Sequence, residues 1–405
     1  MKMVKITWVA VFFLCTAGSG CVETGDEKAK EVYSSNAYKG HENDLDSHYF
    51  VNNYPGAIAT RLDDCQTCHR GGEFTYEKNG KKVVTFKNSC DYCHLKVFPD
   101  DTLEGTHPKT FADTLNPYGS DYLAAGRNAD AIKSIDGNDS DADGFSNGDE
   151  IDALKYPGDP GSKPGQANAP LFTMTMSQMK TLSSHEEFLL VNSHKQEFDT
   201  YATYKGVRVD QLLEHAGVDI KSSDFQGITV IAPDGYMKDF TVDDVLGVFP
   251  QSLYYGLFGT SDLGSDCGFV KYPDSMPDGL VDGEAIPDEQ RLIIAYERDG
   301  LPMDSANLDV TSGKINGEGP FRIILPQSTP GEPDRGSKYS PTECNDGHDY
   351  DDAKDHNAGD MVRGTIAIRV NPMPDGLEEF DHYNGGWSYA ENKSLIIYGF
   401  GISKN

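Results

Sequence analysis

The sequence predicts a multidomain protein in which a small, mainly α-helical and irregular domain precedes a larger mixed α/β domain of the α+β kind. Three observations support this fold class. The chain has 405 residues, which is more than one hydrophobic core ordinarily serves. Residues 156–170, YPGDPGSKPGQANAP, have the composition of a linker. After them, short apolar runs bounded by turn residues indicate strands.

Residues 1–20 are predicted to be an export signal. In MKMVKITWVAVFFLCTAGSGC, lysines precede an apolar run, and small residues stand before Cys21. The pattern is typical of a bacterial lipoprotein signal, with Cys21 as the acylated N-terminus and 22–40 as a tether. Ordinary cleavage near Gly20 is the alternative. We therefore expect a protein of the periplasm or the cell surface.

Charge narrows the range of partners. The chain has 35 basic and 65 acidic residues, a formal net charge of −30. A field of this sign repels nucleic acid, so we expect no nucleic-acid partner. Contact with a membrane is expected only through the lipid on Cys21. Val22 follows that cysteine where an aspartate would indicate retention at the inner membrane, which favours the outer membrane.

Two copies of Cys-x-x-Cys-His lie at 65–69, CQTCH, and 90–94, CDYCH. Two thiols at this spacing can form thioethers with one porphyrin, and the adjacent histidine can bind its iron. A zinc or thioredoxin-like site is the alternative, but the histidine in both copies and the export signal favour c-type haem. The sequence therefore predicts two haems on Cys65, Cys68, Cys90 and Cys93, with His69 and His94 as proximal ligands.

The distal iron ligands are predicted to be histidines. No methionine lies between Met3 and Met174, so the nearby candidates are His48 and His107, with His41 in reserve. Iron with two histidine ligands has no open position, which favours electron transfer over oxygen or peroxide chemistry.

Residues 139–150, DSDADGFSNGDE, match the calcium-loop pattern D-x-D-x-D-G-x5-E. A solvated acidic loop is the alternative. The segment NPYGSDYLAAG at 116–126 resembles one that follows CxxCH in bacterial c-type cytochromes, so we expect 41–155 to form one dihaem unit braced by Ca²⁺. The predicted calcium ligands are Asp139, Asp141, Asp143, Phe145 through its carbonyl, Asn147 and Glu150.

The second domain, 171–405, is predicted to contain mainly strands with a few helices. Strands are expected within 227–236, 291–296, 321–326, 365–370 and 394–402. A helix is predicted after YKGVRV, because four apolar residues recur at helical spacing and Gly217 stands where a C-cap belongs. The spare cysteines, Cys267 and Cys344, are predicted to form a disulfide between two acidic insertions.

Four segments in this order resemble the molybdopterin-binding domain of the sulfite oxidase family. They are YKGVRVDQLLEHAGV, VIAPDGYMKDFTVDDV, LIIAYERDGLPM and GEGPFRIILP, within about 171–330. The resemblance implies a mixed α/β fold and, in the family, a molybdenum cofactor beside a haem domain. The family's molybdenum-binding cysteine has no counterpart in 186–207, and the family's pattern of basic and Lys-Trp residues is not found in 327–340, QSTPGEPDRGSKYS. We therefore carry over the fold and expect no molybdopterin; a thiolate from Cys267 or Cys344 is the alternative.

These patterns together predict an exported electron carrier with two haem c groups and one Ca²⁺, whose second domain serves for docking. Its expected partners are redox proteins, in particular other cytochromes of anaerobic or extracellular respiration. The alternative function is a molybdopterin-dependent oxidoreductase of a small oxyanion or sulfoxide that uses the haems as an electron relay. A third is a binding module for a mineral or partner surface.

Overall fold

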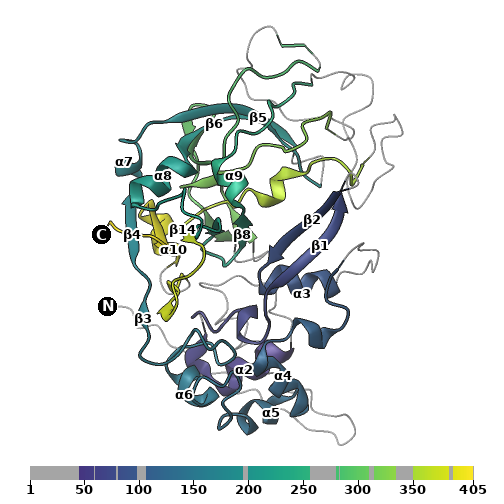
Figure 1. The fold of residues 1–405 in the computed structure, drawn as a ribbon, viewed down its shortest axis with the longest axis vertical. Helices are drawn as coiled ribbons and strands as arrows, with labels where there is room; N and C mark the ends of the chain where they lie inside the picture. The colour runs from purple at the N-terminus through teal and green to yellow at the C-terminus, as the bar shows by residue number, and fades with distance from the viewer. Residues whose placement is uncertain are drawn as a thin grey trace, which may run out of the picture.

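The computed structural model describes residues 45–58, 60–78, 81–97, 106–194, 199–255, 280–281, 283–309, 314–333, 350–382 and 386–404. The predicted signal peptide, tether and disulfide therefore lie outside the described residues, as do Cys21 and His41. Figure 1 shows the short helices of the N-terminal part at the bottom and the sheets of the C-terminal part above them.

The N-terminal part consists of short helices and one β-hairpin. The helices are α2 (Leu45–Asn53), α3 (Ser89–Val97), α4 (Pro117–Ala124), α5 (Ala129–Ser134) and α6 (Asn147–Asp152), with 3-10 turns η1 (Pro55–Ala57), η2 (Cys65–Thr67) and η3 (Phe111–Thr114). The hairpin pairs β1 (Gly72–Lys78) with β2 (Lys81–Lys87). It joins the two CxxCH segments, and the sequence prediction did not include it.

A hydrophobic cluster of its own fills the N-terminal part. Its buried members come from α2, η1, α4, α5 and α6 and from the segments next to them, and they lie between Phe50 and Tyr156. Local sequence explains how these short helices begin: Asn116 accepts a hydrogen bond from the Gly119 backbone at 2.8 Å, and Pro117 occupies the first helical position.

The C-terminal part contains two five-stranded sheets. The first is antiparallel, in the order β10–β9–β6–β5, with β13 also paired to β9. Its strands are β5 (His185–Val191), β6 (Thr200–Arg208), β9 (Ile293–Arg298), β10 (Leu301–Pro302) and β13 (Arg322–Ile324). The second has the order β4–β16–β14–β7–β8, with β14 and β16 parallel. Its strands are β4 (Leu171–Thr175), β7 (Ile228–Ile231), β8 (Met237–Phe240), β14 (Ala367–Val370) and β16 (Ser394–Gly399).

Smaller elements complete this part of the chain. They are β3 (Ala167–Asn168), which pairs with β15 (Leu377–Glu378), the pair β11 (Asn307–Asp309) and β12 (Lys314–Asn316), the helices α7 (Met176–Met179), α8 (Val209–Ala216), α9 (Val242–Leu246) and α10 (Gly386–Glu391), and the turn η6 (Asn357–Asp360).

The helix predicted after YKGVRV is confirmed as α8. Its apolar face, Val209, Leu212, Leu213 and Ala216, is fully buried in the largest core cluster, and Gly217 ends the helix with a left-handed φ of 92°. The five predicted strand segments contain β7, β9, β13, β14 and β16. Helices and several mixed sheets give the chain the α+β character that its sequence predicts.

Candidate functional site

The two CxxCH segments line one cavity of about 460 Å³. Such a volume is in the range of cofactor pockets. All four cysteines and both adjacent histidines contribute to its wall: Cys65, Cys68, His69, Cys90, Cys93 and His94. The rest of the wall is largely apolar and includes Phe50, Val51, Leu62, Phe111 and Leu115. The fold thus brings the residues predicted to hold haem together in an environment that suits an apolar macrocycle.

Cys65 and Cys90 lie in direct contact within this wall. The thiol of Cys90 donates a hydrogen bond to Cys65, and this bond, together with burial, raises the pKa of the Cys90 thiol well above its usual value.

The backbone of the first motif is held by side chains from outside it. Asp64 accepts a hydrogen bond from the Gln66 backbone at 2.8 Å and caps the 3-10 turn η2. Asn116 donates from its side-chain amide to the carbonyls of Gln66 at 2.8 Å and Thr67 at 3.1 Å. These bonds satisfy carbonyls that the short turn leaves open, so Asn116 fixes the shape of the loop carrying Cys65.

Thr114 orients the imidazole of His69. The Thr114 hydroxyl donates its one hydrogen to the Phe111 carbonyl at 2.7 Å and lies 3.0 Å from Nδ1 of His69. Nδ1 must therefore carry the proton and donate to Thr114, which leaves Nε2 with a lone pair for a metal. The sequence analysis did not identify Thr114, which belongs to no spaced motif, and it included Asn116 only as the first residue of the segment 116–126.

The second motif lies on α3. Cys90, Cys93 and His94 stand at i, i+3 and i+4 of this helix, so all three project from one face toward the cavity. The Asn88 side chain accepts a hydrogen bond from the Asp91 backbone at 2.8 Å and begins the helix.

The predicted distal ligands are placed differently. Neither His48 nor His107 is among the residues that line the cavity. His48 lies on α2, whose residues 46, 47, 50 and 51 form the cavity-facing side, and His107 contacts the Pro108 carbonyl through Nδ1 at 3.0 Å. The structure therefore does not bring these two imidazoles to the proximal ones, and their ligand role stays a prediction.

Carboxylates of the 139–150 loop converge. Oxygens of Asp139, Asp141 and Asp143 all lie within 4.8 Å of one another. Gly144, with φ of 101°, makes the sharp turn that the calcium-loop pattern places there. Among the described residues these three form the one such group of histidine, cysteine or acidic side chains.

Glu150 of α6 lies close enough to this group to be affected by the charges of Asp139, Asp141 and Asp143. It is fully buried, and neither of its carboxylate oxygens has a hydrogen-bond partner; one oxygen each of Asp141 and Asp143 is also buried and unpartnered. Burial, then the charges of Asp141 and Asp143, raise the pKa of Glu150 to about 9. Buried polar atoms without partners are rare, and a bound cation would satisfy these. The donor set fits a hard divalent cation such as Ca²⁺.

Two other predicted ligands have backbone or scaffold contacts. The Phe145 backbone donates to Asp143 at 2.9 Å. Asn147 is buried, accepts from the Ser140 backbone at 3.2 Å and donates to the Ile135 carbonyl at 2.8 Å. Asn147 thus closes the loop against α5, and its contact with a metal stays a prediction.

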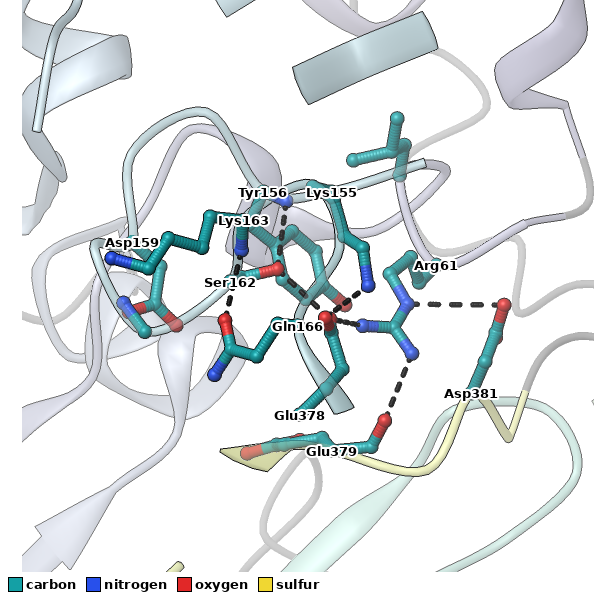
Figure 2. A network of polar contacts seen from close by, with 12 residues as sticks. Arg61, Lys155, Tyr156, Asp159, Ser162, Lys163, Gln166, Glu378, Glu379 and Asp381 are labelled. Carbon is teal, nitrogen blue, oxygen red and sulfur yellow. Dashed lines mark hydrogen bonds and ion pairs between the residues drawn. The ribbon is translucent and has the colours of Figure 1, made fainter. Parts of the chain in front are cut away.

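A buried ionic cluster joins the N- and C-terminal parts, as Figure 2 shows. Glu378 of β15, with its side chain 1% exposed, accepts from Arg61, from Lys155 and, at 3.0 Å, from Ser162. Arg61 also donates to the Glu379 carbonyl at 3.0 Å. Arg61 lies four residues before Cys65, so this cluster attaches the first CxxCH segment to the C-terminal part. Arg61 and Glu378 are 317 residues apart in the sequence, so sequence patterns do not reveal their contact.

Comparison with models of protein families, with curated proteins and with solved structures found no match to this chain. Within the described residues, no helix has the length and apolar composition needed to cross a bilayer.

Proposed function

We propose that this protein carries electrons one at a time through two covalently attached haem c groups. The observation that carries this proposal is that both CxxCH motifs, although 25 residues apart, line a single apolar cavity. Cys65 with Cys68, and Cys90 with Cys93, would hold the two groups, and His69 and His94 would bind the irons. The haems supply a reversible change between ferric and ferrous iron.

The protein's own residues have defined tasks in this proposal. The thioethers fix each group, so that reduction and oxidation occur without its loss. Thr114 keeps the lone pair of His69 on Nε2, and the apolar wall lowers the local dielectric, both of which influence the reduction potential. Because Cys65, Cys68, Cys90 and Cys93 line one cavity, they would hold the two groups near each other, which would favour transfer between them.

Ca²⁺ in the 139–150 loop is part of the same proposal. The ion would neutralise the four carboxylates of Asp139, Asp141, Asp143 and Glu150 and tie α6 to the start of the loop. Because α5 and α6 contribute to the cluster that also contains Phe50 and Val51 of the cavity wall, the ion would brace the haem-binding part. The role is structural.

For the C-terminal part we propose a fold related to the molybdopterin-binding domain of sulfite oxidases, serving as a scaffold for the haem-binding part and for docking of redox partners. The segment 186–207, where that family has its cysteine, contains none, and here it includes most of β5 and most of β6. No step is assigned to molybdenum in this chain.

The proposed setting is the periplasm or the cell surface, with a lipid on Cys21 holding the protein at the outer membrane and other cytochromes as partners. The export signal and the many carboxylates of the chain support this setting.

Metal analysis of protein from a host that attaches haem c tests the proposal against the oxidoreductase alternative. We expect iron near two per chain, calcium near one and no molybdenum. Molybdenum at one per chain would contradict the scaffold role of the C-terminal part, and absence of iron would contradict electron transfer itself.

A further inference from the structure

A lysine of the C-terminal part reaches into the second CxxCH segment. Lys238 of β8 places its ammonium 3.1 Å from a carboxylate oxygen of Asp91, the residue that follows Cys90 within CDYCH. The same ammonium lies 3.5 Å from Asp360 and over the ring of Tyr236. The side chain of Lys238 is 16% exposed. A pair this sheltered is screened by salt much less than one on the surface.

A second contact joins the same two elements. Asn88, which begins α3, donates from its side-chain amide to the backbone carbonyl of Met237 at 3.3 Å. Asn88 stands immediately before α3 and Asp91 in its first turn, and Met237 and Lys238 are neighbours on β8. The N-terminal turn of the helix that carries Cys90 is thus fixed to the C-terminal part at two points.

We infer that Lys238 is a positioning residue for the second haem and raises its reduction potential; this inference rests on the proposed function. Through Asp91 it fixes the turn that carries Cys90 and Cys93. Reduction adds one negative charge at the iron, and the ammonium of Lys238, which pairs with the residue next to Cys90, would stabilise the reduced form. Without Lys238, the carboxylates of Asp91 and Asp360 lose their common counter-charge, and the ferric form is favoured.

The experiment is a spectroelectrochemical titration of the full-length haem-loaded protein, in which the two haems are resolved as separate transitions. We compare Lys238→Met, Lys238→Arg and Asp91→Asn with the unchanged chain. Lys180→Met is the matched control, because Lys180 also pairs with a carboxylate, Glu297 at 2.7 Å, and lies over a tyrosine ring, but contacts neither CxxCH segment.

We expect Lys238→Met to lower the potential of one haem and leave the other unchanged, and Asp91→Asn to raise the potential of that same haem. Lys238→Arg keeps the charge and restores the original value, and Lys180→Met shifts neither. A purely structural role would not give opposite shifts for the two members of the pair.

Two results overturn the inference. One is that neither haem changes its reduction potential in Lys238→Met or in Asp91→Asn. The other is an equal shift of both haems in Lys180→Met. If Lys238→Met fails to fold, the direction in which Asp91→Asn shifts the reduction potential decides the test alone. If the protein without substitutions is colourless, the proposed function itself is contradicted. If it binds haem but the Lys238 and Asp91 variants have the same reduction potentials as the original chain, only the role of Lys238 is contradicted.

Discussion

The thiol of Cys90 donates a hydrogen bond to the sulfur of Cys65, so the first cysteines of the two CxxCH motifs meet inside one cavity. The β1–β2 hairpin makes this possible, because it leads the chain away after the first motif and returns it to the start of α3. The contact relates the two predicted attachment sites in space, which their spacing in the sequence alone does not do.

Removing calcium should destabilise the N-terminal part. Chelation leaves Glu150, Asp141 and Asp143 with buried, unpartnered oxygens, and the binding free energy is lost from the folded state. At a hundredfold excess of Ca²⁺ over its dissociation constant this amounts to about 2.7 kcal/mol. We expect EGTA to lower the melting temperature, as calorimetry would record. Glu150→Gln should abolish the response, and the exposed Asp152→Asn on the same helix should keep it.

The stabilisation by Ca²⁺ should grow as the pH rises. Without the ion, the pKa of Glu150 is raised from 4.5 to about 9 in the folded chain. Its contribution to stability is therefore present below about pH 4.5 and is lost as the pH rises toward 9. Ca²⁺ binds the ionised carboxylate and removes this loss. Melting temperatures with Ca²⁺ and with EGTA should diverge between pH 5 and pH 8; a constant difference would contradict the assignment of Glu150.

Breaking the ionic cluster of Figure 2 should loosen the junction between the two parts. Glu378→Gln leaves Lys155 buried without this counter-charge and leaves Arg61 with the more distant Asp381, at 3.8 Å, and loss of one partner of a buried pair costs about 3–5 kcal/mol. Denaturant unfolding should show this loss. Glu391→Gln, at an exposed position of α10, is the control. Equal stability of the two variants would contradict the stabilising role of the cluster at the junction of the two parts.

Replacing a distal ligand should change the spin state of one iron. The sequence predicts His48 and His107 in this role, so His48→Ala or His107→Ala should each give one high-spin haem in the absorption spectrum. Neither imidazole lies on the cavity wall. Spectra unaltered by both substitutions would show that the ligands come from elsewhere, with His41 the next residue to test.

Sequence patterns predicted the elements that are determined by residues close together in the chain. The helix α8 follows from four apolar residues at helical spacing and a glycine that accepts positive φ. The acidic loop follows from residue types at fixed offsets, and its carboxylates do converge. The β1–β2 hairpin was missed, although Asn-Gly at 79–80 is a hairpin signal.

Contacts between distant segments could not be read from sequence. Glu378 meets Arg61, and Lys238 meets Asp91, only because β15 and β8 lie against the N-terminal part. Likewise, Thr114 contacts His69 because the fold places the end of η3 beside the first CxxCH segment. These pairs follow from tertiary packing, which no periodicity or spacing encodes.

The central claim is that two haems are covalently bound to this chain. Its most direct test is the pyridine haemochrome spectrum of protein from a haem c-maturing host, recorded after extraction with acidified acetone and related to protein concentration. The account predicts two haems per chain that remain with the polypeptide. Protein that is colourless, or whose pigment passes into the acetone, would contradict it.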